Sequence, residues 1–276
     1  MEESMKRRFL CVVMVLLMAM GVVSLTGCGD DSESGDSDNT IVVGLDDAFA
    51  PMGFRDEDGE LVGFDIDFAE AVGEEMGMEV EFKPIDWDAK EIELEAGTID
   101  CVWNGMSVTP DRIENMALSN QYLSNNIILM TMADSDIDVT DPSQLADLNI
   151  GTQVDSSALL MLQENEAYDS FSGNISEYDK YDTAFMDLRA GRIDVVAVDQ
   201  VLGEYTNNNL DGEFKACTYE LGGDSYAIGF ASDNTQLRDQ VNDAIKALID
   251  SGEAAEISEE WFGRNIVIFE PVEGEE

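Results

Sequence analysis

The chain has 276 residues, 44% of them hydrophobic and 8% aromatic, which is the composition of a globular protein with more than one lobe or domain. Its formal net charge of −46 argues against nucleic acid and anionic lipid surfaces as partners, and we interpret it as a solvated acidic coat. The chain contains no histidine, which excludes Ser-His-Asp hydrolysis, Cys-His proteolysis and imidazole-based zinc sites, so we expect neither a metal nor a cofactor.

The N-terminus has the pattern of an export signal. Basic residues at 6–8 precede an apolar run over 9–23, which is too short for a comfortable membrane span. Leu25-Thr26-Gly27-Cys28 is similar to a bacterial lipobox, which implies a lipoprotein signal peptide over 1–27 and lipidation of Cys28. Residues 28–39 would then be a flexible tether that anchors the folded part outside the cytoplasm, on the outer face of the membrane or its periplasmic side.

The first half of the folded part alternates strands and helices. We predict strands at 40–45, around 80–82 and at 99–103, and helices from an Asp65 N-cap to Gly77 and over 89–96. This alternation implies a mainly parallel sheet with helices on both faces. The loop that begins at Asp46 leaves the carboxyl end of the first strand, which is where ligands bind in open α/β sheets.

The segment 100–112 organises the predicted site, because it joins a buried strand to a helix start. Thr109 is the expected N-cap, Pro110 the first helical residue, and Arg112 lies in the first turn. A carboxylate bound there would accept a bidentate pair from Arg112, with further hydrogen bonds from Ser107 and the backbone of 104–106. The alternative is a surface arginine that caps a loop, and this segment alone does not separate the two.

An extended run at 125–132 begins a second α/β unit. The pattern predicts helices at 142–146, 158–164 and 182–190, strands at 149–153 and 193–198, a return crossing at 215–221, a strand at 226–230 and a helix at 235–251. The two cysteines beyond the tether, Cys101 and Cys217, fall in different units, so we predict two buried free thiols.

A short internal repeat links the two units. Residues 94–100 (LEAGTID) and 188–194 (LRAGRID) share five of seven residues. The repeat predicts two similar lobes whose strand ends face each other across a cleft, although chance similarity of two βαβ units is the competing explanation. We place the first lobe at 40–124 plus 223–265, the second at 125–222, and an acidic tail at 266–276.

Four motifs taken together resemble the polar-amino-acid family of bacterial extracellular solute-binding proteins, which serve ABC importers. They lie at 61–67, 96–100, 107–112 and 190–194, the last followed by Asp199. The resemblance extends from residue 40 to about 265. It implies a two-lobed periplasmic-binding-protein fold of type II, in which each lobe is a mainly parallel sheet flanked by helices and two hinge strands cross between the lobes.

The resemblance also implies roles for individual residues. Arg112 would hold the α-carboxylate of an amino acid and Asp199 its α-ammonium, while Phe49 stacks on the ligand opposite a wall at Trp87. The remaining pocket residues implied are Asp46, Asn104, Gly105, Met106, Ser107, Ser156 and Ser157. A zwitterion needs opposite charges and a desolvated apolar wall, and because these come from both lobes, binding would favour closure.

The sequence departs from the family pattern at three positions. Asn104 and Gly105 replace small hydroxyl residues, and Asp155 stands where glycine is frequent, either beside the pocket or on its rim. Structural roles compete with each assignment: Phe49 and Trp87 as core aromatics, Asp46 as a turn residue, Asp199 as a helix cap.

The function implied is capture of a free L-amino acid by a monomer and its delivery to a membrane ABC permease, without catalysis. One alternative is an exported enzyme on the same scaffold, similar to cyclohexadienyl dehydratase, and another is a ligand-sensing domain. The lack of histidine and of an obvious carboxylate dyad argues against the enzyme, and the lack of a membrane helix after 265 argues against the sensor. The side chain of the ligand stays open.

Overall fold

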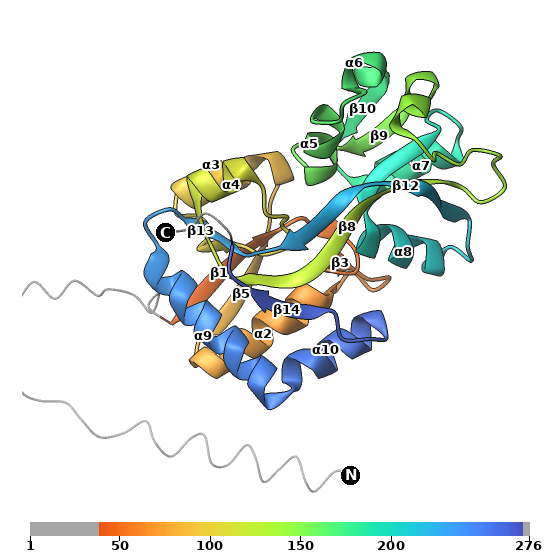
Figure 1. The fold of residues 1–276 in the computed structure, drawn as a ribbon. Coiled ribbons are helices and arrows are strands. Elements are labelled where there is room, and N and C mark those ends of the chain that lie inside the picture. The colour runs from red at the N-terminus through yellow and green to blue at the C-terminus, as the bar shows by residue number, and fades with distance from the viewer. Residues whose placement is uncertain (1–38, 273–276) are drawn as a thin grey trace, which may run out of the picture. The chain divides into compact units, whose positions relative to one another are not determined.

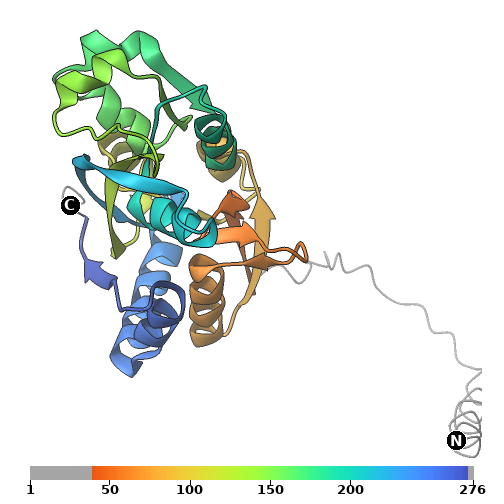
Figure 2. The ribbon, with the colours of Figure 1, turned by 90° about the vertical axis from the view of Figure 1, so that its right-hand side faces the viewer.

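The structure is a computed structural model that describes residues 39–272. The predicted signal peptide and the lipidation site Cys28 lie outside the described residues. Within 39–272, no helix combines the length and apolar character that a membrane span requires. The described chain is an α/β fold with two large sheets and one small sheet, flanked by helices (Figures 1 and 2).

The first large sheet carries the motifs of the N-terminal half. Its strands lie in the order β5 (Glu79–Pro84), β1 (Thr40–Leu45), β6 (Cys101–Val102), β13 (Gly229–Ala231) and β7 (Met116–Leu118). The pairs β1–β5 and β1–β6 are parallel, whereas β13 pairs antiparallel with β6 and β7. A small sheet beside it contains β2 (Ala48–Phe49), β3 (Gly53–Arg55) and β4 (Leu61–Val62).

Helices cover both faces of this first sheet because successive strand residues point to opposite sides. Ile41 and Val43 pack in a cluster with α2 (Phe64–Met76), α9 (Thr235–Ser251) and α10 (Glu253–Phe262). Val42 instead packs against the opposite cluster, which contains Trp87 and Leu94. Trp87 lies in η1 (Trp87–Ala89) and Leu94 in α3 (Lys90–Glu95). The next helix along the chain is α4 (Pro110–Asn115).

The second large sheet has the order β10 (Ile175–Tyr178), β9 (Ile150–Gln153), β11 (Val195–Asp199), β8 (Gln121–Met132) and β12 (Phe214–Tyr226), with β14 (Val267–Glu270) also paired to β8. The three strands β10, β9 and β11 pair in parallel, whereas β8 is antiparallel to its three neighbours. Its helices are η2 (Pro142–Asp147), α5 (Ser157–Gln163), α6 (Tyr168–Phe171), η3 (Ser172–Asn174), α7 (Tyr181–Arg189) and α8 (Gln200–Asn209).

The strands β8 and β12 are the two long strands expected to cross between the lobes. They contain 12 and 13 residues and pair from Leu123 opposite Tyr226 to Met132 opposite Phe214. Figure 1 shows this two-stranded ribbon running from the first sheet into the second. Tyr226 also forms a bridge to Ser107, so β12 reaches the segment that carries Arg112. The structure thus has two lobes, one built on each large sheet, and two crossing strands.

The internal repeat has the same local structure in both lobes. Gly97 and Gly191 each follow a helix with φ of 66°. The two aspartates of the repeat then act alike: the carboxylate of Asp100 accepts from the Val42 N–H at 2.8 Å, and that of Asp194 accepts from the Asn149 N–H at 2.7 Å. Each aspartate therefore ties its strand to the neighbouring parallel strand, which accounts for the shared residues.

Several predicted elements differ from the structure. The helix N-cap is Gly63 rather than Asp65, whose buried side chain points into the core instead. The sheets are mixed rather than mainly parallel, because the crossing strands and β13 pair antiparallel. Elements without a predicted counterpart include β10, α8, α10 and β14, and β14 shows that the chain after 266 begins with a paired strand rather than a tail.

Other predictions agree. The structure confirms that Cys101 and Cys217 are free and buried. It also confirms Thr109 as an N-cap, with its Oγ1 accepting from the Arg112 N–H at 3.4 Å. The residue bounds of the two lobes stay a prediction.

Gly105 and Gly97 form a matched pair for a test of backbone and packing constraints. Both have positive φ, but a Cβ on Gly105 would lie 2.8 Å from Phe49 Cε1, whereas one on Gly97 would meet nothing within 4 Å. We expect Gly97→Ala to lower the free energy of unfolding by ~1 kcal/mol and Gly105→Ala by ~2–4 kcal/mol. Urea denaturation of both variants checks this, and equal losses would contradict the close packing at Gly105.

Candidate functional site

The carboxyl ends of several parallel strands bring polar residues together. Asp46 follows β1, Asn104 follows β6, and Asp199 ends β11. Gln153 ends β9 and is followed by the Ser156 N-cap of α5. Because the first two belong to one sheet and the others to the second, this site lies where the two lobes face each other.

Asp46 is buried and connects the lobes. Its Oδ2 accepts a hydrogen bond from Gln153 Nε2 at 2.8 Å, and Lys180 Nζ lies 3.6 Å from its Oδ1. Burial raises the pKa of Asp46, and the hydrogen bond from Gln153 and the charge of Lys180 oppose that shift. Lys180 also pairs with Asp47 at 2.9 Å, so Asp46 is part of a contact network between the lobes rather than a simple turn residue.

Asn104 and Gly105 form a rigid corner after β6. Asn104 Oδ1 accepts from the Asp46 N–H at 3.1 Å, while its Nδ2 is buried without a hydrogen-bond partner. The Gly105 N–H donates to Asp65 Oδ2 at 2.7 Å, and Tyr122 donates to the same oxygen at 3.0 Å. Burial raises the pKa of Asp65 to about 7. Asn104 and Gly105, the two residues that depart from the family pattern here, therefore take part in the hydrogen bonds that form the corner.

Arg112 is buried between the lobes. Its Nη1 donates to the Ser107 carbonyl at 2.8 Å, and its Nη2 donates to the Asp155 carbonyl at 3.0 Å. Its Cζ lies 5.7 Å from the centroid of the Trp87 ring. With 6% of its surface exposed, Arg112 is not the surface arginine of the alternative interpretation.

Lys90 is a site residue that the sequence analysis missed. Its side chain is fully buried, and its Nζ lies 5.0 Å from the Trp87 ring centroid, 3.2 Å from the Trp87 carbonyl oxygen and in contact with the Asp155 carboxylate. Burial lowers the pKa of Lys90, and the positive charge of Arg112 adds to that shift. The available signal was its position one helical turn before Leu94, on the buried side of α3.

Asp155 lies on the rim of the site. Its side chain is 49% exposed, and its φ of 54° is the left-handed conformation that glycine adopts most readily. This backbone conformation suits the glycine that the family resemblance implies at this position. An aspartate here adds a carboxylate that neutralises Lys90 across the cleft.

A second polar cluster surrounds Ser107. Its hydroxyl hydrogen-bonds to Ser157 Oγ at 2.9 Å and donates to Asp224 Oδ2 at 2.8 Å. Asp199 accepts from Asn125 Nδ2 at 2.8 Å and from the Tyr226 hydroxyl at 2.7 Å. Asp224 is half-buried and was not predicted. It shares the Asn125 amide with the buried Asp199, and the two make a carboxylate pair that the sequence did not show.

Aromatic rings line the same region. Phe49 in the first lobe lies 6.0 Å, centroid to centroid, from Tyr181 in the second, and Trp87 is 8% exposed beneath Lys90 and Arg112. Met106 differs from the other predicted residues: it is fully buried in the cluster between the first sheet and α3. Ser156 acts as the α5 N-cap, with its Oγ accepting from the Leu159 N–H at 3.1 Å.

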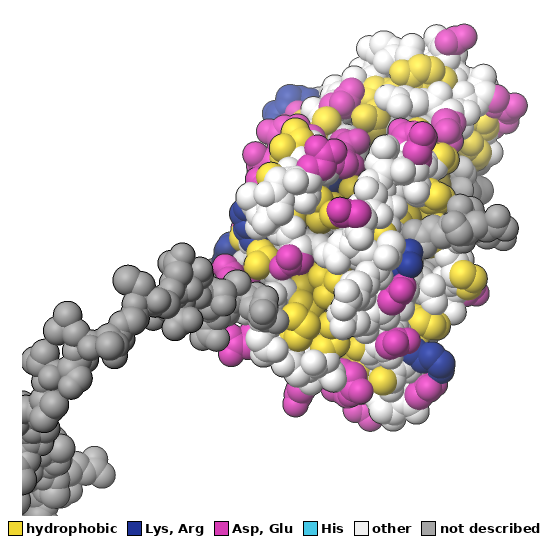
Figure 3. All heavy atoms as spheres, turned by 90° about the vertical axis from the view of Figure 1, so that its left-hand side faces the viewer, with side chains coloured by type: hydrophobic (Ala, Val, Ile, Leu, Met, Phe, Trp, Pro, Cys, Tyr) yellow, Lys and Arg dark blue, Asp and Glu magenta, His cyan; other side chains and the backbone are white. Residues whose placement is uncertain are grey.

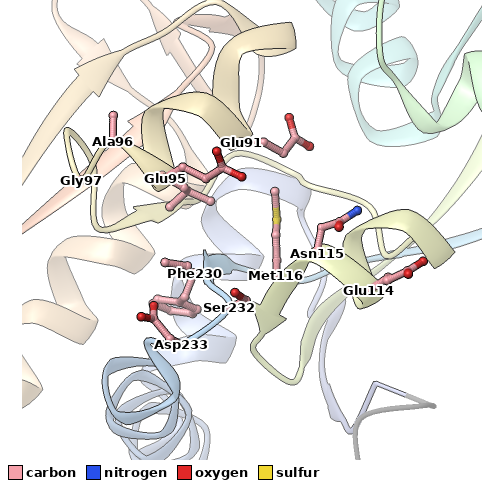
Figure 4. A pocket seen from close by; sticks show the side chains of 12 residues that line it. Glu91, Glu95, Ala96, Gly97, Glu114, Asn115, Met116, Phe230, Ser232 and Asp233 are labelled. Carbon is pink, nitrogen blue, oxygen red and sulfur yellow. The ribbon is translucent and has the colours of Figure 1, made fainter.

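Two of the cavities that contain residues from both lobes lie at this site. One of about 170 Å³ is lined by Asp46, Trp87 and Lys180, and one of about 440 Å³ by Arg112, Asp155 and Ser156. A cavity of about 800 Å³ lies elsewhere, over α3, α4 and β13, with Glu91, Glu95, Glu114 and Asp233 around Met116 and Phe230 (Figure 4). Figure 3 shows acidic side chains spread over one face of the molecule, as expected of a solvated coat.

Replacing one or the other member of the Lys90–Asp155 pair should change the free energy of unfolding by different amounts. Asp155→Asn leaves the buried Lys90 ammonium without its carboxylate and should lower the free energy of unfolding by on the order of 1 kcal/mol, since Asp155 is half exposed. Lys90→Met removes the buried charge beside Arg112 and should cost less or stabilise. Urea denaturation of both variants measures this, and a larger loss for Lys90→Met would contradict it.

Comparison with known proteins identifies the family. The protein-family model described as bacterial extracellular solute-binding proteins, family 3, matches residues 41–264 of this sequence. The chain is 27% identical over 231 residues to the L-cystine-binding protein TcyJ of Escherichia coli strain K12, across 82% of this chain and 84% of that relative. It is 25% identical over 262 residues to the arginine-binding extracellular protein ArtP of Bacillus subtilis strain 168, across 91% and 97%.

A solved structure agrees with these matches. An ABC uptake transporter substrate binding protein from Streptococcus pneumoniae, with bound histidine, has a TM-score of 0.77 and 35% identity, across 83% of this chain and 94% of that chain. The two-lobed α/β fold expected from the sequence is thus confirmed. The family model and this structure each span most of the chain, and the chain therefore belongs to family 3 of the bacterial extracellular solute-binding proteins.

Proposed function

We propose that this protein captures a free L-amino acid between its two lobes and delivers it to a membrane ABC permease for import. The observation that carries the proposal is the placement of buried opposite charges on the two lobes, with Arg112 on one and Asp199 on the other. They lie close enough for the charge of Asp199 to act on the guanidinium. A zwitterion between them would meet a partner for each of its charges.

The relatives support an amino acid as the ligand. Their names describe binding of L-cystine and arginine, and the solved relative holds histidine. In this chain, Phe49 and Trp87 provide apolar walls, and Ser107 and Ser157 provide hydroxyl groups at the carboxylate end. We propose that the ligand side chain extends toward Asp46, Gln153 and Lys180, where a carboxylate, an amide and an ammonium meet.

We further propose that the protein acts without catalysis, as a monomer held at the outer face of the membrane. The relatives named above are binding proteins, and the family is extracellular. Lipidation at Cys28 would supply the anchor, because several acyl chains on one residue hold a protein at a membrane stably.

The first test is a thermal-shift screen of the twenty amino acids and L-cystine. A ligand at 100 times its Kd should add about 2.7 kcal/mol to the free energy of unfolding. With the strongest binder, Arg112→Lys should weaken binding by ~2–5 kcal/mol in titration calorimetry, because lysine keeps the charge but loses the planar pair of donors.

The control is Arg192→Lys, at an exposed arginine that pairs with Asp187 on the same lobe. It should leave affinity unchanged. No stabilising amino acid in the screen, or an Arg112→Lys variant within about threefold of the parent, a difference below ~0.7 kcal/mol, would contradict the proposed site.

The anchor has a separate test. Cells that express the parent chain should incorporate radiolabelled palmitate into it, and Cys28→Ser should abolish the label while the folded part still binds its amino acid. Equal labelling of the two chains, or labelling of neither, would show that Cys28 is not lipidated.

A further inference from the structure

The carboxylates of Asp199 and Asp224 converge on one amide group. Asp224 lies on β12, directly opposite Asn125 on β8 in the strand register. Asn125 Nδ2 donates to Asp224 Oδ2 at 2.9 Å and to Asp199 Oδ1 at 2.8 Å. An amide NH₂ has two hydrogens, so it can serve both acceptors at once. Two carboxylates from different strands therefore share a single neutral donor.

The other groups around the pair leave its negative charge largely uncompensated. The Tyr226 hydroxyl donates to Asp199 and the Ser107 hydroxyl to Asp224, and both donors are neutral. Tyr181 on α7 also faces Asp199. Arg112 on α4 is a positive charge that acts on both carboxylates, yet two of its hydrogen bonds go to the carbonyls of Ser107 and Asp155.

Asp199 is buried and Asp224 half-buried, and two like charges that share one amide partner away from bulk water are costly to maintain together. Burial first, and then the neighbouring Asp224 charge, raises the pKa of Asp199 to about 7, and burial raises that of Asp224. Near neutral pH the pair therefore holds a proton for part of the time. A cation placed between the carboxylates would favour loss of that proton.

We propose that Asp224 and Asp199 together form a paired-carboxylate seat for the α-ammonium of the amino acid, and that occupation of the seat releases a proton to water. The proposal rests on the proposed function and adds a binding residue and a linked proton to it. An ammonium has three N–H donors, so it can bond to both carboxylates and retain one donor for a further acceptor. The ligand keeps its own protons, and the proton lost comes from the carboxyl pair.

The proton linkage has a definite sign. Protonation of the empty seat competes with ligand binding, so affinity should rise with pH while the seat loses its proton, from about pH 5 to pH 8. The increase should approach, and not exceed, tenfold per pH unit for release of one proton. Above that range affinity should level off.

Titration calorimetry measures the released proton directly. L-Arginine and L-glutamine are suitable probes because their side chains do not titrate between pH 5 and 8. For a probe that binds, heats recorded at pH 6 and pH 8 in phosphate and in a buffer of larger ionisation enthalpy should differ at pH 6 by nearly one proton per ligand. The difference should shrink at pH 8.

Variants separate the pair from other titrating groups. Asp224→Asn should abolish most of the proton release and flatten the pH dependence, while binding persists with reduced affinity at pH 8. Asp233→Asn, at an exposed aspartate outside the site, should change neither. If Asp224→Asn does not fold, a second control remains in the parent protein: 5-guanidinopentanoate, which is L-arginine without its α-amino group, should bind without proton release.

The outcomes distinguish this inference from the proposed function. Binding of an amino acid with no net proton release at pH 6, or with unchanged release in Asp224→Asn, overturns the paired seat and leaves the proposed function intact. Failure of every amino acid in the thermal-shift screen overturns the proposed function, and the seat with it.

Discussion

The placement of buried charge between the two lobes is the constraint on which the rest of the structure depends. Charges removed from water need partners, and here the partners come from the opposite lobe. Arg112 donates a hydrogen bond to the Asp155 carbonyl, and Lys90 pairs with the Asp155 carboxylate. Asp46 accepts a hydrogen bond from the Gln153 amide. Each of these pairs joins a residue of one lobe to a residue of the other, so in this structure contact between the lobes and neutralisation of the buried charges occur together.

Sequence reasoning was most successful where the signal was local. The cap at Thr109 and the helix-ending glycines at 97 and 191 act through their own backbone, so their neighbours in sequence were sufficient to predict them. The positions of Arg112 and Asp199 at the lobe interface followed from the family resemblance together with these local elements. Their roles in binding stay a proposal.

The residues that were missed depend on contacts distant in sequence. Lys90 is buried because Asp155, 65 positions away, neutralises it, and Asp224 joins the site because β12 pairs with β8, 99 positions earlier at Asn125. Asp65 looked like a helix cap, yet it accepts from Gly105, 40 positions away. The pattern of apolar and polar residues along the chain does not predict such pairings, because the sequence around each partner is no different from that around an ordinary surface residue.

The acidic coat has a consequence for how the protein responds to ionic strength. The net charge of the chain is −46, so its acidic side chains repel one another. In physiological salt, exposed charges more than about 8 Å apart are largely screened. The charges between the lobes are largely buried and escape most of that screening. Dissolved ions will therefore weaken the repulsion between surface charges while leaving the pairs between the lobes nearly as strong as in dilute buffer. The ionic strength of the solution should thus change the stability of the fold more than it changes the electrostatics of ligand recognition.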